Sequence, residues 1–235
     1  MNEPKHSIHW VTFLLSWIAG YCDTATFVAA EGIFSAHVTG NFIVFAAQAM
    51  SGGLGTAWVK LLTFPVFVVA VMLGGWLAEG STQRYKLLLI ESILLVGCGL
   101  AAVFLPGLLE ERWAAYLIVM GVVVAMGLQN SFGKLFAKET FGPTTMMTGN
   151  VTQAALDLGA VLRLGRTRAE NAWLSLGRQG ITISGFLFGC LFGALLANYF
   201  GLSAVLLPGM ALLVCYLQGK LHQKKLKYKS RLSMV

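Results

Sequence analysis

A short polar phrase occurs twice in this otherwise apolar chain. His37-Val38-Thr39-Gly40-Asn41 is matched by Met146-Met147-Thr148-Gly149-Asn150. Threonine and asparagine are good helix N-caps and glycine lets the backbone turn sharply, so each phrase predicts the start of a helix. The N–H groups and positive dipole end of such a helix suit an anion or a carbonyl-bearing solute. We therefore expect solute-binding residues at both phrases; the alternative is a capped helix that only packs. The expected residues are Thr39, Gly40, Asn41, Thr148, Gly149 and Asn150.

A second pair of matching phrases precedes the first. Gly20-Tyr21-Cys22-Asp23-Thr24 corresponds to Gly127-Leu128-Gln129-Asn130-Ser131. A carboxylate in an apolar segment costs roughly 3 kcal/mol on insertion scales, so Asp23 must be paired, protonated or hydrated. We interpret Asp23 as a proton-coupling residue of the binding site; the alternative is a structural hydrogen bond to the opposing Thr-Gly-Asn helix start. Gln129 and Asn130 are expected at the same site, and His37, which titrates near neutral pH, could exchange protons with Asp23.

Other polar residues in the apolar segments give weaker signals. Asp157 is expected to pair with Arg163 or Arg166, and Glu91, about one turn into its segment, is set aside as an interfacial residue. The cysteines form no CxxC pair and the histidines no ligand cluster, so we expect neither a metal nor another cofactor. The HExxH, GxSxG and P-loop signatures are absent, so we do not expect an enzyme.

The composition predicts a membrane protein. Of 235 residues, 57% are hydrophobic and only 11% are charged, and the mean hydropathy is +0.72. Soluble domains carry about 25% charged residues. The net charge of +7 does not indicate nucleic-acid binding, because the basic residues gather in short loops and in a tail over 220–235, as cytoplasmic flanks of membrane helices do. The expected surroundings are a lipid bilayer.

Six stretches approach the length of about 20 apolar residues that a membrane-spanning helix needs. They are Ile8–Ala30, Trp58–Glu79, Leu87–Leu105, Trp113–Gly133, Gly177–Tyr199 and Gly201–Gly219. Two shorter helices, Thr39–Met50 and Thr148–Arg163, follow the polar phrases. We predict an all-α polytopic protein in which these two are re-entrant or broken helices.

The matching phrases divide a single membrane domain, 1–235, into two repeats, about 8–106 and 112–220. If both short helices are re-entrant, each half holds three spans, so the repeats are inverted and both termini lie in the cytoplasm. If both cross, there are eight spans and parallel repeats. The six-span alternative leaves only Lys60 and Arg112 on the outside, so the positive-inside rule favours it. Gly185, Gly189 and Gly193 form a stripe of small residues that we assign to internal packing rather than to a dimer face.

The two Thr-Gly-Asn phrases, with Gly20–Asp23 and Gln129-Asn130, make the chain resemble the YoaK-like family of bacterial integral membrane proteins. The resemblance covers nearly the whole chain. It implies a location in the bacterial inner membrane, and the family carries no established substrate.

These observations predict a small-solute transporter with a polar site near the bilayer midplane, coupled to protons through Asp23. Two alternatives stay open. One is a passive channel that uses the same site, and the other is a scaffold or membrane-assembly protein in which the polar phrases only lock helices together. The solute and the oligomeric state, a homo-oligomer included, are not defined by the sequence.

Overall fold

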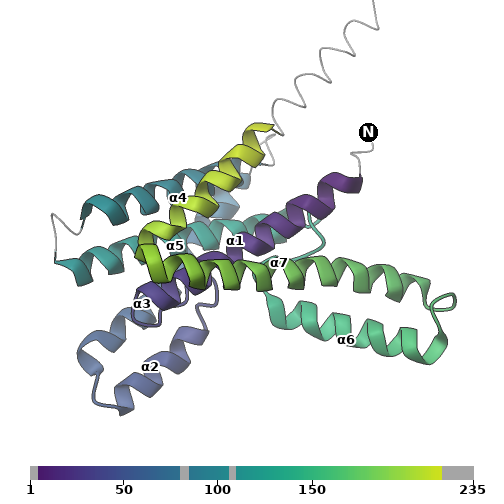
Figure 1. Cartoon of the computed structure of the whole chain (residues 1–235), viewed down its shortest axis with the longest axis horizontal. Coiled ribbons are helices and arrows are strands. Elements are labelled where there is room, and N and C mark those ends of the chain that lie inside the picture. The colour runs from purple at the N-terminus through teal and green to yellow at the C-terminus, as the bar shows by residue number, and fades with distance from the viewer. Residues whose placement is uncertain (1–4, 80–84, 106–109, 219–235) are drawn as a thin grey trace, which may run out of the picture.

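The computed structural model describes residues 5–79, 85–105 and 110–218, and all regular structure within these ranges is helical (Figure 1). The predicted all-α polytopic membrane fold is confirmed. Five helical segments are long and apolar enough to cross a bilayer, namely those over Ile8–Ala29, Gly55–Ala78, Lys86–Phe104, Glu111–Leu135 and Glu170–Gln218. In chain order the elements are α1 (Lys5–Ala29), α2 (Gly40–Met50), α3 (Leu54–Ala78), α4 (Lys86–Phe104), α5 (Glu111–Leu135), α6 (Met147–Leu164), α7 (Glu170–Phe200), the 3₁₀ helix η2 (Gly201–Val205) and a C-terminal helix over 206–218.

The predicted segments match the helices closely except at two starts. Helix α3 begins at Leu54 rather than Trp58, and α7 begins at Glu170 rather than Gly177. Hydropathy misses the first turns of α7 because they carry polar residues, while contacts with α6 hold them in a helix. Gly219, Arg84 and the basic tail over 220–235 lie outside the described residues.

Helices α1 and α5, the first helix of each predicted repeat, run in opposite directions. Near the end of α1, Glu31 accepts a hydrogen bond from the Tyr116 hydroxyl (3.0 Å), close to the start of α5. Further along α5, Gln129 Nε2 donates to the Leu15 carbonyl (2.7 Å), in the first half of α1. Opposite directions of equivalent helices are the relation expected of inverted repeats. The alternative of eight spans and parallel repeats is contradicted, because it requires α1 and α5 to be parallel.

Each of these first helices packs against the third helix of the other half. Helices α1 and α7 lie together in parallel, with Gly20 against the Phe186 carbonyl. Helices α3 and α5 repeat the arrangement, with Gly127 facing the Phe67 carbonyl. Phe67 and Phe186 are equivalent positions of the predicted repeats, so the two contacts are related by the same pseudo-twofold operation. The missing Cβ lets the two backbones approach closely, and the glycine stripe of α7 faces α1, as internal packing requires.

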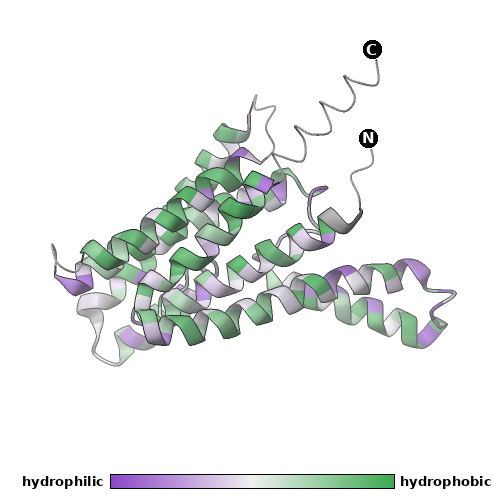
Figure 2. Cartoon of the chain, turned by 45° about the horizontal axis from the view of Figure 1, so that its top comes forward, coloured by the Kyte–Doolittle hydropathy of each residue, from purple (hydrophilic) through white to green (hydrophobic). Residues whose placement is uncertain are grey.

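The bundle has its centre at α1 and α5 and its lipid-exposed surface at α3. Within the apolar windows of α1 and α5, 61% and 67% of the residues are buried, against 17% for α3. Helix α3 exposes large apolar side chains around most of its surface, and Figure 2 shows hydrophobic colour covering most of the outer face of the bundle. A water-soluble protein would not expose so much contiguous apolar surface.

Helices α2 and α6 do not cross the bundle. Asn41 bonds Thr63 and Gln48 bonds Thr56, so α2 starts level with the middle of α3 and returns to the face where α3 begins. Helix α6 runs back along α7 in a hairpin that extends beyond the end of the bundle (Figure 1). Each half therefore contains one helix that starts at depth and returns to the face from which the chain entered.

The last helical segment, Glu170–Gln218, crosses twice. Gly201 (φ +55°) ends α7, and the chain then turns through η2. Gly99 faces Leu206 and Gly209 faces Leu95, so the C-terminal helix is antiparallel to α4. Helix α4 is antiparallel to α5, since Tyr85 lies against Phe132 and Cys98 against Gly121. It therefore runs parallel to α1, and the C-terminal helix runs opposite to α1. Residue 218 therefore lies toward the face at which α1 begins, which we call the N-terminal face.

Candidate functional site

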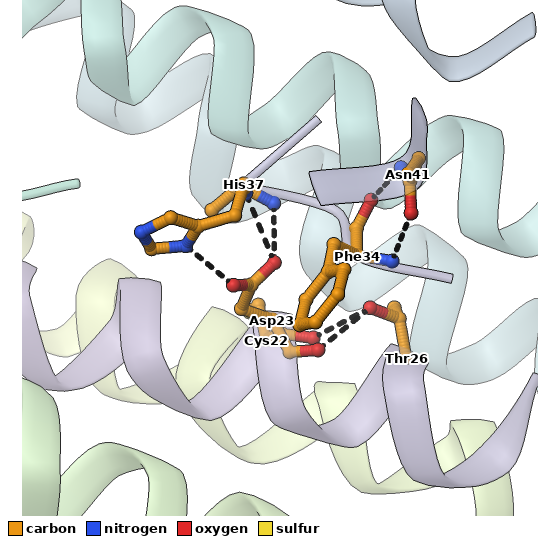
Figure 3. Close-up of polar contacts among 7 residues, drawn as sticks. Cys22, Asp23, Thr26, Phe34, His37 and Asn41 are labelled. Atoms are coloured by element: carbon orange, nitrogen blue, oxygen red, sulfur yellow. Dashed lines mark hydrogen bonds and ion pairs between the residues drawn. The ribbon is translucent and has the colours of Figure 1, made fainter. Parts of the chain in front are cut away.

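Asp23 binds the loop that precedes α2 (Figure 3). It lies six residues before the end of α1 and is 3% exposed. Its Oδ1 accepts the backbone N–H of Ala36 (2.7 Å) and that of His37 (3.2 Å), and its Oδ2 lies 2.6 Å from His37 Nδ1. Both oxygens of the carboxylate are therefore satisfied, which is how a charge becomes tolerable at this depth. The partners belong to its own repeat and not to the opposing Thr-Gly-Asn helix start.

His37 forms the titratable half of this ion pair. The hydrogen bond that His37 donates to Asp23 raises the pKa of His37; burial of the ring opposes this shift, and the charge of Asp23 adds to it. The ring also meets Phe186 of α7 edge-on, with 5.6 Å between centroids. Its side chain is 37% exposed, and in Figure 3 its second nitrogen points away from Asp23. A proton can thus reach His37 without displacing the contacts that Asp23 makes to the loop.

Asn41 closes the same loop and fixes it to α3. Its Oδ1 accepts the N–H of Phe34 (2.8 Å), and its Nδ2 donates to the Phe34 carbonyl and to Thr63 Oγ1 (2.8 Å each). Thr63 in turn donates to the Lys60 carbonyl (2.7 Å). The asparagine is therefore a loop clamp and not the N-cap that its residue type suggests.

The start of α2 differs from the prediction in a second way. Thr39 is exposed and makes no side-chain cap. The first three N–H groups of the helix, from Gly40 to Phe42, already donate to the carbonyls of His37, Val38 and Thr39. In this conformation these groups are not free to bind a solute, because a tight turn has taken up the donors that a helix start usually leaves unpaired.

The second Thr-Gly-Asn phrase repeats the clamp in a weaker form. Asn150 Nδ2 donates to the Pro143 carbonyl (3.0 Å), the same seven-residue interval that joins Asn41 to Phe34. Proline has no N–H, so the reciprocal bond cannot form here. Helix α6 begins at Met147, which places the phrase inside its first turn, and both Thr148 and Gly149 are exposed.

Gln129 links the second loop to the first half of the protein. Besides its bond to the Leu15 carbonyl, Nε2 donates to Thr144 Oγ1 (2.9 Å), while its Oε1 is buried without a partner. The Thr12 hydroxyl of α1 also accepts the N–H of Phe141 (3.2 Å). Asn130, the repeat counterpart of Asp23, is partly buried and makes no side-chain hydrogen bond to the residues that the structure describes. The two halves are therefore chemically unequal.

The two loops reach α1 at different depths. The second loop contacts Thr12 and the first contacts Asp23, which are about 16 Å apart at the rise of an α-helix. Each asparagine keeps its hydrogen bonds within its own repeat. Two open grooves of about 280 and 240 Å³ lie elsewhere, one over α3 and α5 and one over α4 and α5, and apolar side chains line both. A polar pocket shared by both loops stays a prediction.

Two acidic residues differ from what the sequence suggested. Asp157 does not pair with Arg163 or Arg166; its Oδ1 accepts from Gln153 Nε2 (2.9 Å), and Arg166 instead lies over the Trp173 ring at 4.4 Å. Glu91, set aside as interfacial, is completely buried, and both of its carboxyl oxygens lack a hydrogen-bond partner. The adjacent Ser92, a second polar residue in this apolar helix, is the sequence feature that could have indicated a buried Glu91.

The bundle, with one short helix in each half and a partly buried Asp23–His37 pair at the first loop, defines a polytopic helical membrane protein. The chain belongs to the DUF1275 family of proteins of unknown function, whose family model matches residues 11–218. No curated protein and no solved structure matches the chain.

Proposed function

We propose that the protein is a proton-linked transporter of a small polar solute, described here in a closed conformation. One observation carries the proposal: a titratable ion pair, Asp23 and His37, joins a spanning helix to the re-entrant loop of an inverted-repeat bundle. Non-helical backbone at membrane depth is tolerated only where protein buries it or where it lines a wet cavity. Loops of this kind are the part of a transporter that moves relative to the rigid helices.

The ion pair offers a simple way to couple a proton to this loop. With His37 protonated, its charge compensates Asp23 and holds the loop closed against α1. Loss of the proton through the exposed side of the imidazole leaves the buried carboxylate without its countercharge, which favours a conformation that admits water or a solute group. Asn41 keeps the loop attached to α3 during this change. The coupling role thus falls on the Asp23–His37 pair and not on Asp23 alone.

We further propose that the protein is a YoaK-like member of its family, located in the bacterial inner membrane with both termini in the cytoplasm. The distribution of charge supports this orientation through the positive-inside rule. Lys60 and Arg112 lie toward the opposite face, while the remaining basic residues described lie toward the N-terminal face. The latter are Lys5, Lys86, Lys134, Lys138, Arg163, Arg166, Arg168 and Arg178.

The test uses purified protein in proteoliposomes that contain a trapped pH-sensitive dye. A panel of small polar solutes is added in turn, and solute-driven proton movement is recorded. Asp23→Asn should abolish this movement while the protein still folds, because asparagine can accept the same two backbone N–H bonds. Asp157→Asn is the matched control, since it also neutralises a largely buried carboxylate and should leave the movement intact. Proton movement that survives Asp23→Asn would refute the coupling role.

A second candidate is a membrane scaffold or assembly protein. The observation that favours it is local: the clamps at Asn41 and Asn150 need no ligand, and the two grooves suit acyl chains rather than polar solutes. If no solute in the panel drives either proton movement or passive flux, the scaffold is favoured. Solute flux without proton movement would instead indicate the passive channel.

A further inference from the structure

Glu91 is a buried acidic residue that takes no part in the Asp23–His37 pair. It lies in the second turn of α4, is 0% exposed, and neither carboxyl oxygen has a hydrogen-bond partner in the described part of the chain. Leu87, Leu88 and Leu95 of the same helix belong to the apolar core around it. An ionised carboxylate without partners is strongly disfavoured in such surroundings. The packing therefore selects the neutral, protonated acid.

Among the residues that the structure describes, the groups packed around Glu91 provide no countercharge. Helix α5 contributes Val122, Ala125 and Met126 to the same core, and α1 contributes Cys22. On the C-terminal helix, the Gly209–Leu95 contact sets position 213 opposite Glu91, with Cys215 and Tyr216 less than one turn further along. Cys98 lies two turns along α4 itself. A thiol or a phenol never carries a positive charge, so none of these side chains can neutralise a carboxylate.

We propose that Glu91 is a second proton-binding site, which holds a proton in the closed conformation and exchanges it with water only when α4 separates from its neighbours. The site takes a proton and nothing larger, because its carboxyl oxygens are inaccessible to water in the packed bundle. On separation, the Glu91 carboxylic acid releases its proton to the entering water, leaving a hydrated carboxylate; closure requires that the proton be taken up again. This inference deepens the proposed proton-linked transport and rests on it for its purpose.

Infrared spectroscopy of the purified protein tests the inference without a solute. At about pH 7.5, acids with ordinary pKa values of about 4 are ionised, so only a protected carboxylic acid gives a C=O stretching band. We expect such a band in the wild type, its loss in Glu91→Gln and its retention in Asp157→Asn. Glutamine resembles the neutral acid in shape, so this variant should fold. Glu91→Asp, which should shift the band rather than remove it, guards against a nonspecific effect of substitution.

Transfer to D₂O then tests exchange. The band should move to lower frequency while the protein remains folded, since transient separation of α4 lets the acid exchange its proton. A wild type without a band that depends on Glu91 would overturn the protonation, and a band that never shifts in D₂O would overturn the exchange. Failure of the transport proposal is a separate result, because it appears as an absence of solute-driven proton movement in proteoliposomes.

Discussion

Replacing Gly189 with alanine probes the packing of α1 against α7, on which the inverted arrangement depends. A Cβ at Gly189 would collide with the Trp17 carbonyl and lie 2.9 Å from the Tyr21 backbone nitrogen. Both neighbours are backbone atoms, so no side chain can rotate out of the way. The two helices must separate or α7 must shift.

The size of the effect follows from two opposing contributions. Overpacking of a well-packed interior costs about 1–3 kcal/mol, and the rigid backbone contact places Gly189 toward the upper end of that range. Replacing glycine by alanine within a helix recovers about 0.5–1 kcal/mol. Further separation at Gly185 and Gly193, which face the same helix, offsets that gain. We expect Gly189→Ala to lower the free energy of unfolding by about 2 kcal/mol.

Gly180 is the matched control on the same helix, because a Cβ there meets nothing within 4 Å. Gly180→Ala should raise the free energy of unfolding by about 0.5–1 kcal/mol. Reversible unfolding in mixed detergent micelles, followed by circular dichroism, measures both variants against the wild type. Equal stabilities of the two variants would refute the close approach of α1 and α7.

Two further predictions concern the loops. Because Asp23 raises the pKa of His37, the ion pair stabilises the fold fully below about pH 6.5 and loses this contribution as the pH rises through the raised pKa. The difference in stability between wild type and His37→Gln, measured by thermal unfolding across pH, should therefore shrink as the pH rises. A difference that stays constant would contradict this prediction. Asn41→Ala removes three hydrogen bonds and Asn150→Ala one, so at about 1 kcal/mol per bond the first should lower the unfolding free energy by about 3 kcal/mol and the second by about 1. Equal losses in unfolding free energy would refute the idea that the Asn41 clamp is stronger than the Asn150 clamp.

The spanning helices and their order could be predicted from the sequence because each is a long apolar run, and the positive-inside rule favoured six spans over eight. The pairing of Asp23 with His37 was also within reach, since both residues flank one loop. The hydrogen bonds that the Thr-Gly-Asn phrases make could not be predicted from the sequence. Residue type alone does not distinguish an asparagine that caps a helix from Asn41, whose amide turns back to Phe34.

Glu91 shows where hydropathy stops being informative. Helix α4 is apolar on all sides, so its sequence does not indicate which face turns inward. A glutamate near a helix end can extend to the interface or point into the bundle, and only the rotation of α4 against α5 decides between them. The hydrogen bond of Gln129 could not be predicted for the same reason, because its partner Leu15 lies in the other half of the chain and the two meet only where α5 packs against α1.

The membrane sidedness of two short turns tests the inverted arrangement most directly. Ser51 follows α2 and Thr167 lies between α6 and α7, and both are exposed. Each is replaced by a single cysteine in a background without the four native cysteines, and a membrane-impermeant thiol reagent is applied to spheroplasts and to inverted vesicles. Inverted repeats predict labelling of Ser51→Cys from the outside and of Thr167→Cys from the cytoplasm. Labelling of both from the same side would contradict the account, because parallel repeats place the two turns on one face.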